Sequence, residues 1–194
     1  MAIISTQNKN KSNRNYCRSI LLAALASTAF AGTPAVAQND MAAFQYQKVS
    51  SYYQAIWTNP ITHNRVYMDS SWNITTKYEN GNPVSTFNDP TISGGLSVVI
   101  GQSQEDLKSN AEYLLNTNGN GEYHFTHSEF FNYKNELTWF ASGYLISKPD
   151  HGFILYLRKS GSSLYNVLGI YTLDKETNDK VGHLSSKLVD SFSR

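Results

Sequence analysis

Most of the second half of this chain has the pattern of β-strands, in which successive side chains point to opposite faces, and this pattern constrains the fold more than any other feature. Between residues 122 and 173, the segments have the two-residue period of β-strands and carry bulky residues on both faces. Phe153, Leu155 and Leu157 share one face, for example, opposite Ile154, Tyr156 and Arg158. Short turns interrupt the alternation at Lys134-Asn135-Glu136, at Pro149-Asp150 and at Ser160-Gly161-Ser162. Since short turns join antiparallel neighbours, the pattern predicts an antiparallel meander. Its expected segments are 122–127, 129–133, 137–147, 152–159 and 163–173.

Two amphipathic helices are predicted beside these strands. The first follows Ser103, its predicted N-cap, and has Glu105 and Asp106 in its first turn, where the helix dipole favours acids. The second runs from about residue 175 to residue 192, and Asp174 can cap it. Each helix carries one apolar stripe, formed by Leu107, Ala111, Leu114 and Leu115 in the first and by Val181, Leu184, Leu188, Val189 and Phe192 in the second.

The first half of the chain has shorter strand signals. Alternation predicts a strand over 53–58 that Asn59-Pro60 ends, extended pieces at 65–68, 72–78 and 86–89, and a strand at 96–100. Asn80-Gly81-Asn82-Pro83 and the stretch 116–121 are predicted turns. Residues 38–51 are weakly patterned and are expected to form a short helix or a loose arm. The predicted fold class is therefore α+β, an antiparallel β-sheet with two amphipathic helices packed on it. It forms a single domain over 38–194, with 38–60 as its lead-in and first strand.

Residues 1–37 have the pattern of a cleaved export signal. Four basic residues, Lys9, Lys11, Arg14 and Arg18, precede an apolar stretch from Ile20 to about Gly32. Ala35-Val36-Ala37 then supplies the small-x-small pattern that signal peptidase recognises. The apolar stretch is shorter than the roughly 20 residues of a membrane span. We expect export by the general secretion route, a periplasmic or secreted location, and no membrane span after cleavage.

Removal of this segment changes the chemistry of the chain. It takes four of the 16 basic residues and none of the 15 acidic ones, which leaves a net charge of about −3. A mildly acidic protein lacks the basic surface that nucleic acid requires, so no nucleic-acid partner is expected. Cys17 is the only cysteine, so the remaining 157 residues have neither a disulfide nor a thiol nucleophile.

The order of these segments, together with the residues at its landmarks, resembles the PsbP/Mog1-like family and its bacterial periplasmic members. The landmarks are Met68-Asp69-Ser70-Ser71-Trp72, Phe87-Asn88-Asp89-Pro90, the strand at 96–100 with the helix after it, and the terminal helix that ends in Val189-Asp190-Ser191-Phe192. The proline that usually precedes the tryptophan in that family is Ser70 or Ser71 here. The resemblance spans residues 62–194. It implies an antiparallel sheet with helices packed on it and a binding, assembly or adaptor role without shared catalytic residues.

Catalytic patterns are weak. His124 and His127 are candidate metal ligands, but residues three apart on a strand point to opposite faces unless the strand breaks or bulges. No Gly-x-Ser-x-Gly elbow and no phosphate-binding Gly-x-x-x-x-Gly-Lys pattern occurs. We therefore expect no cofactor and no enzymatic activity. The alternative is a small periplasmic hydrolase or a metal-dependent enzyme.

Aromatic residues are concentrated in the predicted meander. The core needs some of them, and the remainder must lie on the other sheet face, where exposed aromatics are the usual material of a binding surface. We expect a non-enzymatic protein that binds another protein or an apolar ligand in the periplasm. Two concrete forms are an immunity protein that neutralises a secreted toxin and an envelope assembly factor. The candidate binding residues are Tyr123, Phe125, Phe131, Tyr133, Trp139, Phe140 and Tyr144.

Overall fold

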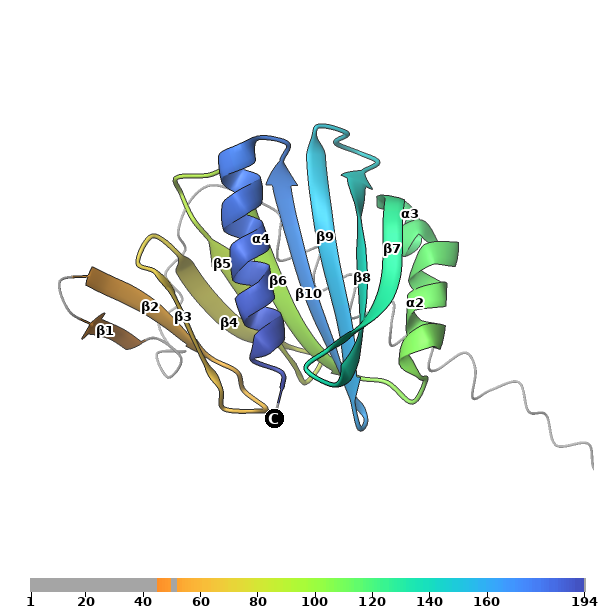
Figure 1. The fold of residues 1–194 in the computed structure, drawn as a ribbon, viewed down its shortest axis with the longest axis horizontal. Coiled ribbons are helices and arrows are strands. Elements are labelled where there is room, and N and C mark those ends of the chain that lie inside the picture. The colour runs from red at the N-terminus through yellow and green to blue at the C-terminus, as the bar shows by residue number, and fades with distance from the viewer. Residues whose placement is uncertain (1–44, 50–51, 194) are drawn as a thin grey trace, which may run out of the picture.

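A computed structural model of the chain describes residues 45–49 and 52–193 (Figure 1). The predicted export signal lies outside the described residues. No helix within the described ranges is long and apolar enough to cross a membrane. The elements follow in the order β1 (Gln45–Val49), β2 (Tyr52–Thr58), β3 (Arg65–Asp69), β4 (Asn73–Glu79), β5 (Asn82–Asn88), β6 (Gly94–Gln102), α2 (Leu107–Asn116), α3 (Asn118–Gly121), β7 (Tyr123–Tyr133), β8 (Glu136–Leu145), β9 (His151–Ser160), β10 (Ser163–Thr172) and α4 (Lys175–Asp190).

The strands form two antiparallel sheets. The larger one has the order β4-β5-β6-β10-β9-β8-β7, and the smaller one has the order β1-β2-β3. β7, β8, β9 and β10 are successive neighbours, so the predicted meander is confirmed. The antiparallel α+β architecture is confirmed as well. The second sheet is the part of the architecture that the sequence pattern did not indicate.

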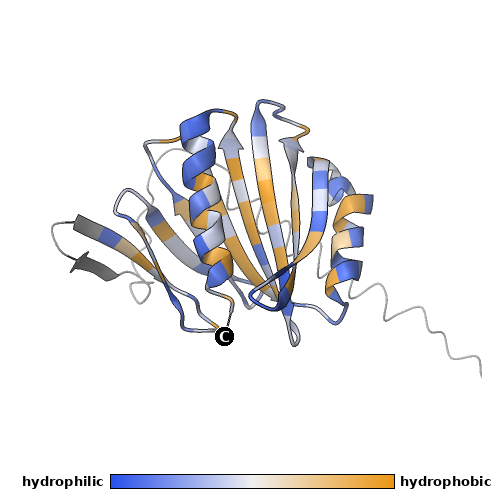
Figure 2. Cartoon of the chain, in the orientation of Figure 1, coloured by the Kyte–Doolittle hydropathy of each residue, from blue (hydrophilic) through white to orange (hydrophobic). Residues whose placement is uncertain are grey.

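The large sheet is covered on both faces. α4 packs on β6 and β10, with the small sheet beside it, and α2 packs on β8 and β9 (Figure 1). We call the first face the α4 face and the second the α2 face. Trp57, Phe87 and Leu188 belong to the core on the α4 face, and Trp139 and Phe153 to the core on the α2 face. Figure 2 shows the matching apolar stripes along the central strands and on the inner side of α4.

α4 lies over β10 because a glycine there leaves room for it. A Cβ at Gly169 would lie 2.6 Å from Cγ1 of Val181, a contact that real side chains do not make. A Cβ at Gly94, in the adjacent strand β6, would likewise lie only 2.8 Å from Cγ2 of Thr177 in the same helix. These two close approaches place the helix on one half of the sheet.

Two landmark segments of the sequence meet beneath α4. The buried carboxylate of Asp89 accepts hydrogen bonds from Ser71 Oγ at 2.8 Å, from the Thr91 amide at 2.9 Å and from Thr91 Oγ1 at 2.7 Å. Burial alone would raise the pKa of Asp89, but these hydrogen bonds and nearby Lys180 lower it below its usual value. Asp89 therefore remains charged and ties the start of β4 to α4.

Three local predictions were wrong. The lead-in contains the strand β1, which pairs with β2, where a helix or a loose arm was expected. The N-cap of α2 is Asp106, which accepts a hydrogen bond from the Ser109 amide at 2.7 Å, rather than Ser103. Segments 122–127 and 129–133 are one continuous strand, β7, with a bulge between Phe125 and His127.

Two predicted turns have a defined geometry. Asn80 and Gly81 both have positive φ, as a two-residue hairpin turn requires, so β5 begins directly at Asn82. The run from Asn118 to Gly121 also has positive φ throughout, which makes α3 a left-handed turn. Only glycine and asparagine adopt this conformation at low cost, so its Asn-Gly-Asn-Gly sequence has a steric reason.

Candidate functional site

Part of the α4 face lies beyond the reach of α4. The helix packs on β6 and β10, and β7 and β8 lie beside it with no described helix across them on this face (Figure 1). Cross-strand pairing identifies the side chains that share this region. Glu129 pairs with Phe140 and Phe140 with Tyr156, so alternate residues of β7, β8 and β9 point outward together. We call the half-buried rings here the open aromatic face, formed by Phe131, Tyr133, Phe140, Tyr144 and Tyr156.

The rings of the open aromatic face contact one another and two histidines. The centroids of Phe140 and Tyr156 are 5.0 Å apart, and Phe140 is 6.0 Å from the ring of His127. At the other end, Tyr144 stacks on His124 with centroids 4.5 Å apart. Mutual ring contacts of this kind hold aromatic side chains in fixed positions. The surface is therefore a largely preorganised array.

The bulge in β7 places His124 and His127 on the same face. A bulge inserts one residue into the strand, so residues three apart no longer point in opposite directions. His127 Nε2 lies 3.5 Å from Glu129 Oε1 at the exposed surface. Within the described ranges, no group of three or more histidine, cysteine, aspartate or glutamate residues is placed to hold a metal ion.

Three of the seven candidate binding residues lie on the opposite face of the sheet, so the prediction that they belong to the binding surface was wrong. Tyr123 and Trp139 are 0% and 1% exposed, and Phe125 packs beside them in the core under α2. The centroids of Tyr123 and Phe153 are 4.7 Å apart, and burial raises the pKa of the Tyr123 phenol. These side chains support the sheet from behind. Phe131, Tyr133, Phe140 and Tyr144 remain together on the other side.

Tyr156 and Arg158 were not among the candidates, although alternation in β9 already placed them on one face. Burial raises the pKa of Tyr156, whose ring fills the space between Phe140 and α4. Arg158 is 1% exposed and closes one end of the open aromatic face. Its guanidinium donates to the carbonyl of Tyr133 at 2.7 Å and to that of Val189 at 3.3 Å, and its Nε lies 2.8 Å from Glu136 Oε2.

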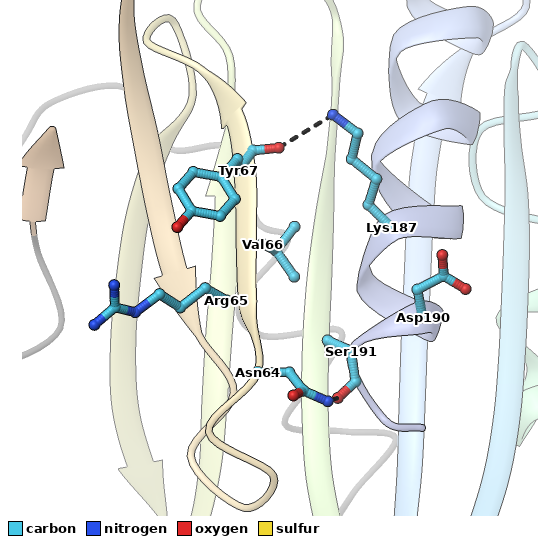
Figure 3. A pocket seen from close by; sticks show the side chains of 7 residues that line it. All are labelled: Asn64, Arg65, Val66, Tyr67, Lys187, Asp190 and Ser191. Atoms are coloured by element: carbon cyan, nitrogen blue, oxygen red, sulfur yellow. Dashed lines mark hydrogen bonds between the residues drawn. The ribbon is translucent and has the colours of Figure 1, made fainter. Parts of the chain in front are cut away.

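A second concave region lies between β3 and the carboxyl-terminal half of α4 (Figure 3). It is a cavity of about 410 Å³ lined by Asn64, Arg65, Val66, Tyr67, Lys187, Asp190 and Ser191. Lys187 also lines a neighbouring cavity of about 50 Å³ that reaches Asp69, Trp72 and Lys180. Together they line the space between α4 and the edge of the small sheet that β3 forms, which we call the β3–α4 groove.

Comparison with known proteins identifies the fold. No protein-family model and no curated protein sequence matches the chain. Among solved structures, the chain is similar to the cyanobacterial PsbP protein (CyanoP) of Synechocystis sp. PCC 6803, with a TM-score of 0.52 and 12% identity over 84% of this chain and 96% of that chain. A mutant of protein Mog1 also matches, with a TM-score of 0.39 and 11% identity over 66% of this chain and 84% of that one.

The class that these findings define is the PsbP-like fold. The likeness to cyanobacterial PsbP extends over nearly the whole of that protein, which confirms the predicted resemblance at the level of the fold. A similarity at 12% identity shows only that the two proteins share a fold, so the function must be inferred from the surfaces of this chain.

Proposed function

We propose that this chain is an exported, non-enzymatic binding protein that recognises a partner protein or an apolar ligand through its open aromatic face. The observation that supports this proposal is the position of α4, which covers one half of its face of the sheet and leaves the half over β7 and β8 lined by half-buried rings. Partly exposed aromatic side chains add contact area at a low cost in side-chain entropy, and they dominate many protein interfaces.

The shape of the surface favours a protein as the partner. A sheet face presents its side chains as a broad, shallow array, whereas small ligands are usually enclosed in clefts. Phe140 and Tyr156 lie at the centre of the array, and the polar side chains of His124, His127 and Glu129 lie along its β7 edge. An apolar centre with a polar rim is the usual anatomy of a protein interface.

The proposed location, the periplasm, is inferred from residues 1–37 and is part of the proposal. If this segment is an export signal, the purified periplasmic protein begins at Gln38. Intact-mass measurement would show it, and a protein that retained Met1 or began elsewhere would contradict cleavage after Ala37. In that compartment, neutralisation of a secreted toxin and assistance in envelope assembly are the two roles that a binding protein of this kind would fill.

A pull-down from the native periplasm tests the binding function. Phe140→Ala combined with Tyr144→Ala should abolish capture of a stoichiometric partner, because it removes one ring from the centre of the surface and one from its end, while thermal unfolding remains cooperative. Tyr78→Ala is the matched control, since Tyr78 is 69% exposed on the distant strand β4, and its capture should equal that of the wild type.

Two outcomes would oppose the proposal. Equal capture by the double variant and the wild type would exclude the open aromatic face as the binding surface. Absence of any partner, together with turnover of a generic ester or peptide substrate, would favour the alternative of a small hydrolase.

A further inference from the structure

The β3–α4 groove is bounded on one side by the edge of a sheet. In the three-stranded sheet, β3 pairs with β2 on one side only, and no other described strand pairs with its second edge. The carbonyl of Tyr67 points from this edge into the groove, since it accepts a hydrogen bond from Lys187 Nζ at 3.1 Å (Figure 3). In an antiparallel pair, the amide and the carbonyl of one residue point the same way. The amide of Tyr67 therefore faces the groove as well, as do the backbone groups of Arg65.

One end of the groove is closed by hydrogen bonds, and the cavity of about 410 Å³ is its roomiest part. Asn64 Nδ2 donates to the carbonyl of Ser191 at 2.9 Å and to that of Ser193 at 2.7 Å, which joins β3 to the end of α4. Val66 lies between the strand edge and the helix (Figure 3). Further along, Lys187 lines both the larger cavity and the smaller one.

The charges of the groove indicate what kind of segment fits. Arg65 and Lys187 form no ion pair with any described residue. Asp190, the acid on α4 that lines the larger cavity, is already paired with Lys134 at 3.2 Å. Lys187 reaches across the groove, whereas the guanidinium of Arg65 lies on the exposed side of β3 and points away from α4 (Figure 3). Both cations are next to the path of a strand added at this edge, which favours a segment that carries carboxylates.

We propose that the β3–α4 groove binds an extended, acidic segment of a partner protein, which adds a strand to the free edge of β3. The incoming backbone takes the carbonyl of Tyr67 from Lys187, and the released ammonium pairs with a carboxylate of the segment. Strand addition of this kind draws affinity from main-chain hydrogen bonds and specificity from side chains on alternate positions. The groove is distinct from the open aromatic face, so this inference holds whether or not that face binds a partner.

A labelled heptapeptide that alternates valine with glutamate is the probe, and fluorescence anisotropy with the purified protein is the measurement. We expect saturable binding, at least tenfold weaker binding of the same peptide with lysine in place of glutamate, and a similar loss for Arg65→Glu or Lys187→Glu. Lys108→Glu on α2 reverses the same charge at a side chain that is 73% exposed, and it should leave the affinity unchanged, as should Phe140→Ala.

Two measurements separate strand addition from simple charge attraction. Alternate amides of an extended peptide point to opposite edges, so N-methylation of one alternate set should abolish binding and methylation of the other set should preserve it. Peptide binding should also slow hydrogen exchange at the Tyr67 amide. Exchange at the amides of Val66 and Met68 should not change, because these amides already face β2. Equal binding of both methylated peptides, or equal binding of the lysine peptide, would overturn the proposal. A dimer that protects the Tyr67 amide without peptide would also overturn it, because the occupant would then be a second copy of this chain.

Discussion

Trp139 and Phe140 are adjacent in β8, and their side chains end in different environments. Trp139 is 1% exposed in the core under α2, whereas Phe140 lies half-buried on the open aromatic face. Alternation along a strand is sufficient to separate them. Truncation to alanine should therefore cost roughly 3–5 kcal/mol of stability at Trp139 and much less at Phe140. The two faces of this sheet can thus be tested one residue at a time.

The hydroxyl of Tyr123 is buried without a hydrogen bond to any described residue. Burying a polar group without a partner costs about 1–3 kcal/mol, so its removal should not destabilise the protein.

We predict that Tyr123→Phe leaves the free energy of unfolding unchanged or raises it by about 1 kcal/mol. Urea denaturation measures the change, and Tyr123→Ala, which also removes the ring packed on Phe153, should lose about 3–5 kcal/mol in the same experiment. A loss of more than about 1 kcal/mol for the phenylalanine variant would show that the hydroxyl has a partner.

At the scale of elements, α4 is held at both ends. At its start, Asp174 accepts hydrogen bonds from the Thr177 amide at 2.9 Å and from Thr172 Oγ1 at 2.5 Å. At its end, the carbonyl of Ser191 accepts from Thr62 Oγ1 at 2.7 Å. The first set of bonds belongs to a helix cap, and the second joins the helix to the loop before β3. The helix is therefore fixed to both sheets.

The stabilisation that the Asp174 cap gives to α4 depends on pH. Hydrogen bonds from Thr172 and Thr177 lower the pKa of Asp174 to about 2 in the folded protein, from 3.8 in the absence of such partners. A carboxyl group with a depressed pKa stabilises the fold above its unfolded pKa, and this contribution is lost as the pH falls from about 4 towards 2.

Asp174→Ala should lower the midpoint of thermal unfolding at pH 7, and the difference from wild type should shrink between pH 4 and pH 2. Calorimetry at a series of pH values measures it. Asp179→Ala, an exposed acid inside the same helix, is the control and should follow the wild type across the range. A constant difference between Asp174→Ala and the wild type down to pH 2 would mean that the cap acts without its charge.

At the scale of the whole molecule, Arg158 joins two distant parts of the chain, the turn between β7 and β8 and the end of α4. From the middle of the large sheet it contacts the end of β7 through Tyr133, the start of β8 through Glu136, and the end of α4 through Val189. A buried guanidinium without its partners would be costly, so the partners hold one another in place through it. The open aromatic face is bordered by this junction.

Arg158→Met keeps most of the side-chain volume and removes the charge, and it should cost about 3 kcal/mol because the buried carbonyl of Val189 and the partly buried carbonyl of Tyr133 lose their donor. Glu136→Gln should cost less than about 1 kcal/mol, since the Glu136 side chain is 35% exposed and water can replace the pairing. Chemical denaturation of both variants measures the difference. Equal losses would show that the ion pair, and not the carbonyl contacts, stabilises the junction.

Much of the fold could be predicted because its signals are local. Alternation in β9 and β10, the apolar stripe of α4 and the turn at Asn80-Gly81 each depend on residues close in sequence. The bulge in β7 was not predictable, because Thr126 looks like any other polar strand residue. β1 was missed for a related reason, since its pairing with β2 supplies the order that its own sequence lacks.

The candidate site, too, could be predicted only in part from the sequence. Alternation placed Phe131, Tyr133 and Tyr144 on a strand surface and separated Trp139 from Phe140, but it could not say which face the core would take. The sequence by itself determined the strands, the helices, their apolar stripes and the antiparallel order of the meander. Only the tertiary structure decided that α4 lies over β10 at Gly169 and leaves β7 and β8 open. The physical reason is that periodicity defines the faces of an element locally, whereas the covering of a face depends on packing between residues far apart in the chain.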